Sequence, residues 1–457
     1  MILSDRPAAA ARPYDQRDIA HDYARALLAD LDAPAAGLPR RAPEHPAVGW
    51  ARSGAMALTG RSDGPARVCP VPLAACADGA LMALASLAQR TLPADLSGAR
   101  LLGERAAIAG FGRGGAIAPG GSCRFLRAAD GWIALNLARQ DDWDMLPALV
   151  EGDVPSDWSA LARVLGDHGT DALLAQGRSL GLAIAKHGAP LAAGGWRQIT
   201  QRAAGADRGD RAPLVVDLSS LWAGPLCGHL LHLLGARVVK VESVRRPDGA
   251  RSGPTAFYDL MNAGKQSVAL DLSAADGRRR LRALLARADV VIEASRPRAL
   301  RQLGVQAEAM VAENPGLTWI SITGYGRAGD EADWIAFGDD AGVAAGLSSL
   351  LPTPDGPPIF CGDAIGDPLA GLHAALAAWS GWRSGGGIIS IALSEVVGHC
   401  IAFDCPVSAA DREADWRSYL DARAISAAAP AARRPAGSAR PLGADTVDVL
   451  QELGVAC

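Results

Sequence analysis

From Leu214 to Leu393 the sequence alternates short β-rich runs with stretches of helical period. The runs are LVVDL, ARVVKVE, QSVALDL, ADVVIEA and LTWISITGYG, and a helical segment or a Gly/Pro turn separates each run from the next. Parallel neighbouring strands need crossover connections of this kind, usually made by a helix. The pattern therefore predicts an α/β fold with a largely parallel sheet in this part of the chain.

The length and composition describe a globular chain of more than one domain. With 457 residues the chain exceeds one ordinary hydrophobic core, so about two to four units are expected. No apolar run approaches the roughly 18 residues that cross a bilayer. The first 18 residues, MILSDRPAAAARPYDQRD, have no uninterrupted apolar core and do not resemble a secretion signal. We expect a cytoplasmic protein without a membrane partner.

Cysteine usage and net charge further limit the compartment, metals and partner molecules that can be expected for this chain. The eight Cys include no CxxC pair and no metal-ligand spacing with His, which favours a reduced compartment and no metal. The net charge of −4 predicts no broad basic surface and argues against nucleic acid as a partner.

An internal repeat relates two distant segments. Residues 54–90 align without a gap to residues 346–382, at a constant offset of 292. Duplication is the simplest explanation of such a match. The identical positions include the following pairs: Gly54/Gly346, Gly64/Gly356, Pro65/Pro357, Cys69/Cys361, Gly79/Gly371 and Leu84/Leu376.

The stretch FCGDAIGDPLAGLHAALAAW, from Phe360 to Trp379, places Asp367 at the start of a long apolar helix. Asp followed by Pro is a strong helix start, so an N-cap is the plain interpretation. The alternative is a chemical role. Ala75 aligns with Asp367 in the first repeat, and Val71 aligns with Asp363. The repeat therefore marks both acids as unmatched and does not choose between them.

Five motifs in this part of the chain carry a family resemblance. They are VVDLSSLWAGPLCGHLLHLLGARVVKVES, LMNAGKQSVALDL, DGRRRLRALLARADVVIEASRPRALRQLG, NPGLTWISITGYG and GDAIGDPLAGLHAAL. In order and spacing they resemble the family III CoA-transferases, which include formyl-CoA transferase, carnitine CoA-transferase and α-methylacyl-CoA racemase. The resemblance implies a Rossmann-like parallel-sheet domain with a smaller α+β domain. It also implies acyl-CoA and a carboxylic acid as substrates, with Asp367 as nucleophile.

Coenzyme A carries phosphates and a long arm, so its site needs backbone N–H groups, cations and a trough. In LSSLWAGPLCGHLL a strand turns into a helix, and a glycine there lets a ligand approach the backbone. The resemblance, with Arg245 taken as the replacement for an arginine that the family often has near Ser243, implies CoA contacts at the following residues: Ser220, Leu221, Trp222, Ala223, Gly224, Arg245, Lys265, Ala294 and Ser295.

The order of the parts differs from the family's layout. A sequence segment that resembles the family's small domain, residues 120–151, precedes the Rossmann-like segment. The chain therefore resembles a rearranged or fused pair of half-copies. It then forms either a homodimer or a pseudo-dimer within one chain. Four parts are predicted: an N-terminal helix and connector (1–45), a half-copy with a degenerate site and small domain (46–205), the Rossmann-like domain with Asp367 (206–405), and a linker with a tail helix (406–457).

An ionised carboxylate can attack an acyl-CoA thioester and give a mixed anhydride, which returning CoA thiolate converts to an aspartyl-CoA thioester. We expect Asp367 to do this, with N–H groups near Gly362 and Gly366 stabilising the oxyanion.

Two alternatives stay open. One is an acyl-CoA racemase or isomerase, although Asp339 stands where the family's racemases have His and no His is near it in sequence. The other is a non-catalytic acyl-CoA-binding member, because several CoA contacts have changed type. No candidate for the family's glycine-rich loop is found, and GFGRGG (110–115) is predicted to be a flexible turn.

Overall fold

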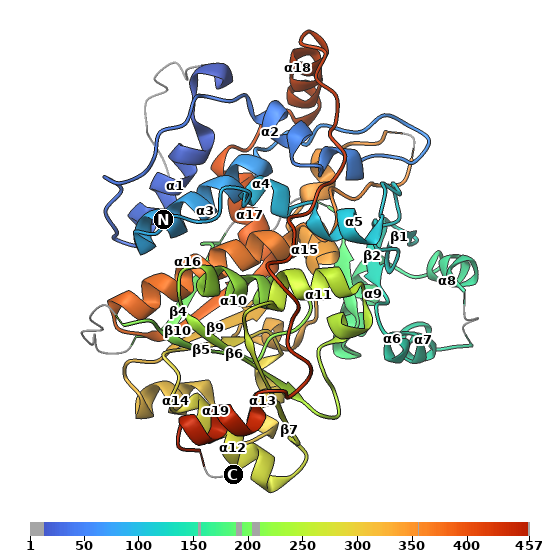
Figure 1. Ribbon diagram of the computed structural model, residues 1–457. Coiled ribbons are helices and arrows are strands. Elements are labelled where there is room, and N and C mark those ends of the chain that lie inside the picture. The colour runs from blue at the N-terminus through green and yellow to red at the C-terminus, as the bar shows by residue number, and fades with distance from the viewer. Residues whose placement is uncertain (1–12, 154–156, 189–193, 203–210, 355, 456–457) are drawn as a thin grey trace.

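The computed structural model of the chain describes residues 13–153, 157–188, 194–202, 211–354 and 356–455 (Figure 1). Most of the stretch that was tested for a secretion signal lies outside these residues, as does the predicted boundary between residues 205 and 206. In the described part of the chain no helix has both the length and the apolar composition needed to cross a membrane.

A seven-stranded sheet forms the centre of the second half, in the order β4-β10-β9-β8-β5-β6-β7. Six strands run parallel and only β4 is antiparallel. The predicted α/β fold is thereby confirmed. The strands are β4 (Gln198–Arg202), β5 (Leu214–Asp217), β6 (Arg237–Ser243), β7 (Gln266–Leu270), β8 (Val290–Glu293), β9 (Thr318–Thr323) and β10 (Gly387–Ala392).

Helices cover both faces of this sheet, as Figure 1 shows. On β5, Val215 packs into the core of one face and its neighbour Val216 into the core of the other, because successive side chains of a strand point to opposite sides. One face carries α10 (Ala223–Leu233), α11 (Thr255–Asn262) and α16 (Gly366–Ser384). The other carries α12 (Ala275–Leu285), α14 (Ala307–Glu313) and α19 (Thr446–Glu452).

A smaller α+β unit lies before the seven strands of this sheet in the sequence. Its three antiparallel strands are β1 (Cys123–Arg127), β2 (Trp132–Asn136) and β3 (Ala183–Lys186). The unit has an apolar core of its own. The helices around it are α6 (Gln140–Asp144), α7 (Leu146–Val150), α8 (Trp158–Leu165) and α9 (Thr170–Ser179).

The N-terminal helices share the core of the α/β part. Helix α3 (Leu73–Ala88) packs between α1 (Ile19–Asp30) and α16. The helix predicted within residues 1–45 is present as α1, which follows a short 3-10 turn. The remaining helices that the site uses are α2 (Pro46–Arg52), α4 (Gly98–Leu101), α5 (Glu104–Ala109), α13 (Pro297–Gln302), α15 (Gly338–Ala344) and α17 (Leu393–Phe403).

The C-terminal segment runs across the molecule from α18 (Ala409–Asp421) to α19, which was predicted as a tail helix (Figure 1). Helix α18 was not predicted. The stretch between them is fixed at Arg433, whose Nε donates a 2.6 Å hydrogen bond to the buried Glu104. The predicted linker is therefore held against the first half of the chain.

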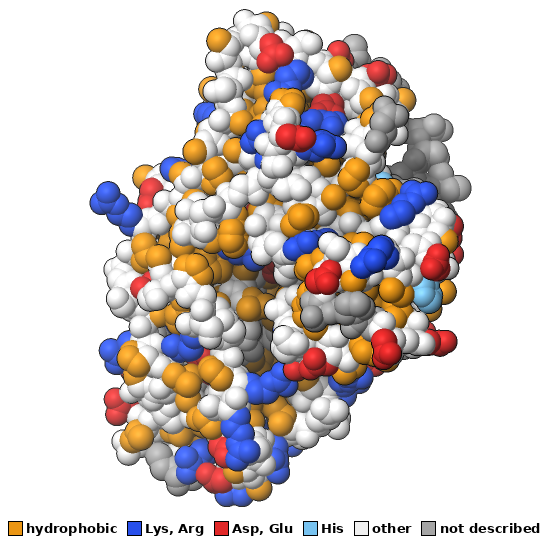
Figure 2. All heavy atoms as spheres, turned by 90° about the vertical axis from the view of Figure 1, so that its right-hand side faces the viewer, with side chains coloured by type: hydrophobic (Ala, Val, Ile, Leu, Met, Phe, Trp, Pro, Cys, Tyr) orange, Lys and Arg blue, Asp and Glu red, His pale blue; other side chains and the backbone are white. Residues whose placement is uncertain are grey.

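The face that includes the smaller unit is hollowed near its middle (Figure 2). Acidic and basic side chains are mixed with apolar ones across this face.

Candidate active site

The order of the six parallel strands reverses between β5 and β8. Counted along the chain it is three-two-one-four-five-six, so the loops after these two strands diverge and leave a crevice at their carboxyl ends. The loop after β5 folds tightly against α10, because a Cβ on Gly224 would lie 2.1 Å from the Cβ of Ser219. Glycine at 224 is therefore required by the loop itself.

A cavity of about 300 Å³ lies in this crevice. Arg139 and Arg296 add positive charge to its wall. Burial and the nearby Arg298 and Arg139 lower the pKa of Arg296, and no ion pair to it is found among the described residues. Six residues predicted to contact CoA line the cavity together with Asp367: Ser220, Leu221, Ala223, Gly224, Ala294 and Ser295.

Asp367 lies in the first turn of α16, but its side chain does not cap that helix. The helix begins at Gly366 with Ile365 as N-cap. The Oδ2 atom of Asp367 instead accepts a 3.0 Å hydrogen bond from the backbone N–H of Gly338 in α15. A Cβ on Gly338 would lie 2.5 Å from this oxygen, so only glycine fits beside it. The N-cap interpretation is wrong, and the carboxylate is free for another role.

The charge state of Asp367 depends on two opposing effects. Burial raises its pKa to about 6, against the lowering effect of Arg105 and of backbone N–H groups at Gly338 and Ala223. The carboxyl group is therefore ionised at neutral pH and is a better base than an exposed aspartate.

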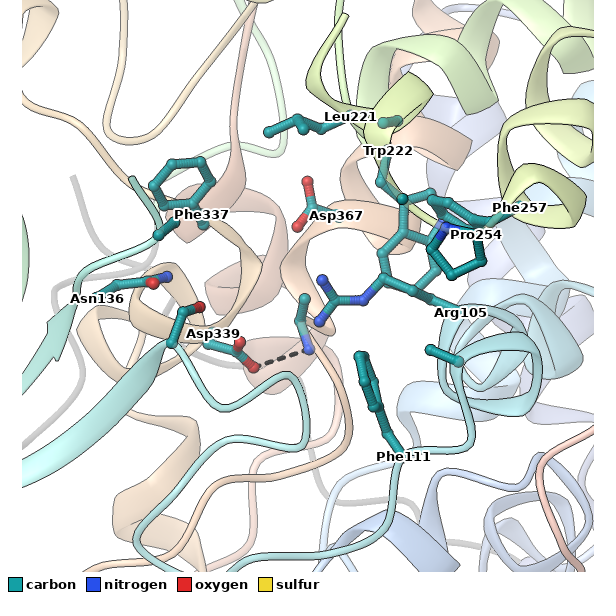
Figure 3. Close-up of a pocket in the computed structure, with 16 residues that line it drawn as sticks. Arg105, Phe111, Asn136, Leu221, Trp222, Pro254, Phe257, Phe337, Asp339 and Asp367 are labelled. Carbon is teal, nitrogen blue, oxygen red and sulfur yellow. Dashed lines mark hydrogen bonds between the residues drawn. The ribbon is translucent and has the colours of Figure 1, made fainter. Parts of the chain in front are cut away.

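Asp367 also lines a second cavity, of about 250 Å³ (Figure 3). Leu221, Phe337 and Asp367 line both cavities, so the carboxylate stands at their junction. The second cavity is mostly apolar. Its other labelled lining residues in Figure 3 are Arg105, Phe111, Asn136, Trp222, Pro254, Phe257 and Asp339.

A family model described as CoA-transferase family III matches residues 213–414. This part of the chain belongs to CoA-transferase family III. The matched residues include both loops of the crevice and Asp367.

Two curated relatives share this family III region. The succinyl-CoA–D-citramalate CoA-transferase of Chloroflexus aurantiacus is 35% identical over 171 residues, which cover 36% of this chain and 42% of the relative. The formyl-CoA:oxalate CoA-transferase of Escherichia coli is 28% identical over 166 residues, or 35% of this chain and 40% of the relative. The chain thus spans about two fifths of the length of these relatives.

A solved structure, a CAIB/BAIF family protein from Brucella suis, is 30% identical with a TM-score of 0.39. The match covers 50% of this chain and 60% of that protein.

Lys265, predicted to bind CoA, lines neither cavity. Its side chain is buried, and Nζ donates to Asp217 Oδ2 at 2.8 Å and to the carbonyl oxygen of Pro225 at 2.9 Å. Burial raises the pKa of Asp217, but Lys265 and Lys240 outweigh it and hold that pKa below its usual value. In the structure Lys265 supports the end of β5 and the start of α10 from inside.

Arg245 and Trp222 were also predicted to contact CoA, but neither lines the crevice. Arg245 is exposed, lies 3.5 Å from Asp271 and lines neither cavity. Trp222 lines the apolar cavity rather than the crevice.

The structure also separates the two acids that the repeat left unmatched. Asp363 is fully buried and lines neither cavity. Its Oδ2 accepts a 2.8 Å hydrogen bond from Arg105 Nε, and its Oδ1 a 2.5 Å bond from Arg105 Nη2. Asp363 therefore holds an arginine from the first half of the chain in the wall of the cavity, whereas Asp367 faces the cavity.

Arg105 lies at the centre of the site (Figure 3). Its guanidinium carbon is 5.5 Å from the ring centroid of Trp222 and 5.7 Å from that of Phe111. Burial lowers its pKa, but Asp363, Asp339 and Asp367 raise it by more, so it stays charged. Arg105 was not predicted from the sequence, because no motif includes it. GFGRGG follows α5 as a turn and supplies Phe111.

Two further acids lie beside the cavity in α15. Burial raises the pKa of Asp339 to about 7, with Asp363 and Asp367 adding to the rise. Its Oδ1 accepts a 2.8 Å hydrogen bond from the N–H of Ala364 (dashed in Figure 3). Burial also raises the pKa of Asp340 to about 7; its Oδ1 accepts from the N–H of Phe337 and from Asn136.

The expected oxyanion donor at Gly362 is already in use. Its N–H donates a 2.9 Å hydrogen bond to Thr59 Oγ1, so that part of the prediction is wrong. The turn before α16 is strained instead: Ala364 has a φ of 42°, and Leu221, opposite it in the cavity wall, has a φ of 69°. Such strain in residues other than glycine is concentrated at functional sites.

Proposed function

We propose that the protein is a CoA-transferase that moves coenzyme A from an acyl-CoA to a carboxylic acid through Asp367. The observation that carries the proposal is the place of this carboxylate, at the junction of a crevice with cationic walls and an apolar cavity. An acyl-CoA thioester matches these two compartments, because it has the charged CoA on one side of the reacting carbonyl and the acyl group on the other.

The reaction is written in four steps. The Asp367 carboxylate attacks the thioester carbonyl, the carbon–sulfur bond breaks, and CoA leaves as the thiolate with a mixed anhydride on the enzyme. The thiolate attacks the aspartyl carbonyl, which releases the first acid and leaves an aspartyl-CoA thioester. The acceptor carboxylate attacks this thioester and again expels the thiolate. Attack of the thiolate on the acceptor's acyl carbon gives the new acyl-CoA and restores Asp367.

The residues of the crevice fit the CoA side of this reaction. Arg296 has no carboxylate partner in the described part of the chain, and Arg139 lines the same wall. Guanidinium groups match phosphate oxygens in geometry and charge. We assign the phosphates of CoA to these arginines, and its arm to the loops after β5 and β8.

The cavity side supplies the electrostatics. Arg105 keeps a positive charge beside the place where negative charge develops on the attacked carbonyl. A fixed cation there stabilises the tetrahedral transition state without reorganisation.

We also infer that one chain forms the two-part site as a pseudo-dimer. Arg105, Phe111 and Asn136 come from the first half of the chain and complete a cavity around Asp367 from the second half. Sedimentation of the active protein tests this inference: full activity in a monomer supports it, and activity confined to a dimer contradicts it.

Trapping tests the proposed reaction directly. The full chain is incubated with a panel of acyl-CoAs, treated with hydroxylamine or borohydride, and mapped by peptide mass. A modified peptide containing Asp367 is expected, and it should vanish in Asp367→Ala. Binding of acyl-CoA with no trapped adduct and no exchange of label would contradict the transferase and favour the non-catalytic alternative.

A second candidate, an acyl-CoA racemase or isomerase, is favoured by one observation. Asp339 lines the same cavity as Asp367, and its raised pKa of about 7 suits proton transfer at neutral pH. Incorporation of solvent deuterium at the α-carbon, without an acceptor acid and lost in Asp339→Asn, would support this activity. Label exchange between acids without deuterium uptake would exclude it.

A further inference from the structure

We infer that the apolar cavity selects a small, uncharged acyl group, so that the substrates are acyl-CoAs of short monocarboxylic acids and not of dicarboxylic acids. The inference rests on the proposed function and names the substrate class of that site. It concerns the part of the substrate beyond the reacting carbonyl.

The walls of the cavity favour hydrocarbon. Trp222 and Phe257 pack edge to face, with ring centroids 5.6 Å apart at an interplanar angle of 84°. Phe111, Pro254 and Phe337 complete the apolar surface (Figure 3). Burying an acyl chain here gains about 25 cal/mol for each Å² removed from water, whereas a carboxylate would lose its hydration.

The charges of the cavity oppose a second carboxylate. Among the lining residues that the structure describes, Arg105 is the one Lys or Arg, and two hydrogen bonds pair it with the buried Asp363. Asp339 and Asp367 add two more carboxyl groups to the wall. When both are ionised the site carries an excess of negative charge, and a distal carboxylate would meet repulsion without a free cation.

Asn136, the amide in the wall, does not change this balance. Its Nδ2 uses one of two hydrogens in a 3.2 Å hydrogen bond to Asp340, and a neutral amide brings no positive charge to offset a carboxylate. Hydrogen bonds of this kind hold the wall in place.

The size of the cavity limits the chain length. Its volume of about 250 Å³ lies below the roughly 300–1,000 Å³ of pockets that hold drug-sized ligands. Phe257 and Phe111 are among the residues that bound this space, and we expect long acyl chains to fit it less well than short ones.

Isotope exchange between an acyl-CoA and its own free acid tests this without choosing an acceptor. Butyryl-CoA with labelled butyrate is compared with succinyl-CoA and labelled succinate, which have the same chain length and differ in the distal carboxylate. We expect kcat/KM for butyryl-CoA to be greater by roughly a hundredfold or more, as for burial of an unpaired charge. Octanoyl-CoA should be slower than butyryl-CoA.

Two variants sharpen the result. Asp339→Asn removes one negative charge, so the preference for butyryl-CoA over succinyl-CoA should fall by about tenfold. Phe257→Ala enlarges the cavity and should raise the rate with octanoyl-CoA relative to butyryl-CoA. Phe111→Leu, a smaller change, replaces it if circular dichroism shows that Phe257→Ala is unfolded.

The outcomes separate this inference from the proposed function. Succinyl-CoA exchange as fast as butyryl-CoA exchange would overturn the inference and leave the transferase standing. Absence of exchange and of trapped adduct with every acyl-CoA would overturn the transferase, and the inference with it.

Discussion

Helices α3 and α16 pack in the same way but differ in chemistry. A Cβ on Gly79 of α3 would lie 2.6 Å from the carbonyl oxygen of Ala20 in α1, and one on Gly371 of α16 would lie 2.7 Å from that of Ala223 in α10. Each glycine lets a neighbouring helix approach closely. The repeat seen in the sequence thus corresponds to two similar helix pairs.

The likeness extends beyond the aligned segments. Helix α2, Pro46–Arg52, and helix α15, Gly338–Ala344, begin and end at the same offset of 292. The glycines that follow them, Gly54 and Gly346, both have left-handed backbones, with φ of 83° and 86°. We infer from this that the two segments fold alike.

The difference lies in the polar residues of the site. Four acids of the second segment align with apolar residues of the first, and Gly338, which donates to Asp367, aligns with Pro46, which has no N–H. Since the first segment folds without these groups, the fold does not require them. The aligned pairs are Asp339/Ala47, Asp340/Val48, Asp363/Val71 and Asp367/Ala75.

The largest effect is expected when Asp367 is replaced by alanine, the residue that the first segment has at the aligned position 75. Asp367→Ala should lower CoA transfer by at least about a thousandfold, because a covalent mechanism has no second nucleophile. The matched control, Ala75→Asp, places the acid in the first segment and should not restore transfer in the double variant. Label exchange between acids measures both, and transfer retained in Asp367→Ala would refute the role of this carboxylate.

The pH dependence follows from the raised pKa of Asp367. Only the ionised carboxylate attacks, so kcat/KM should fall about tenfold per unit below a pH of about 6 and be level above it. Asp339→Asn should leave this limb nearly in place, because Asp339, with a pKa of about 7, is mostly protonated in the range where Asp367 titrates. A profile that is flat from pH 5 to 8 would speak against Asp367 as the titrating group.

The raised pKa values of two other buried acids, Asp339 and Asp340, make the stability of the folded protein fall as the pH rises. The folded protein binds the protons of Asp339 and Asp340 more tightly than the unfolded chain does, with pKa values of about 7. Their contribution to stability is fully present below about pH 4 and is lost as the pH rises through about 7. Asp340→Asn should flatten the decline of Tm over this range, and an unchanged slope would contradict the assignment.

The two glycines allow a direct comparison of the segments. Gly371→Ala and Gly79→Ala should each cost about 1–3 kcal/mol of unfolding free energy, because the new methyl group meets a backbone carbonyl. Only Gly371→Ala should also reduce transfer, since it displaces α10 and the loop that lines the crevice. Gly398→Ala, in a helix with open space at that position, is the control and should be neutral or stabilising. Equal losses of transfer activity in Gly79→Ala and Gly371→Ala would contradict a functional difference between the two segments.

At Thr59, where the first half supports the second, the expected effect is on stability alone. Thr59→Val removes the acceptor of the Gly362 N–H and should cost about 1–3 kcal/mol if that group stays buried. Chemical denaturation measures the loss. Thr59→Ser keeps the hydroxyl and should recover most of the stability, so equal losses in both variants would point to packing instead.

The sequence predicted the parts of the fold that have a strong local pattern. Strands β5 to β9 were found because buried parallel strands are continuous runs of Val and Ile. Strand β10 was missed because GIISIA begins at the last of three consecutive glycines, and β4 because QITQR is polar at an exposed edge.

The residues of the candidate site also divide into those that could be predicted from the sequence and those that could not. Asp367 and the crevice loops lie in contiguous motifs, so their roles could be predicted from neighbouring residues. Arg105 and Asn136 could not, because they are more than 200 residues from Asp367 in the sequence and reach it only through packing of the two halves.

The sequence by itself determined the parallel sheet, the family of residues 213–414 and the two acids, Asp363 and Asp367, that the repeat leaves unmatched. The tertiary structure decided which acid faces a cavity, which arginine lies beside it, and that Lys265 supports the fold from inside. The physical reason is that local patterns fix strands, helices and turns. Burial, pKa and cavity shape instead depend on residues that only the folded chain brings together.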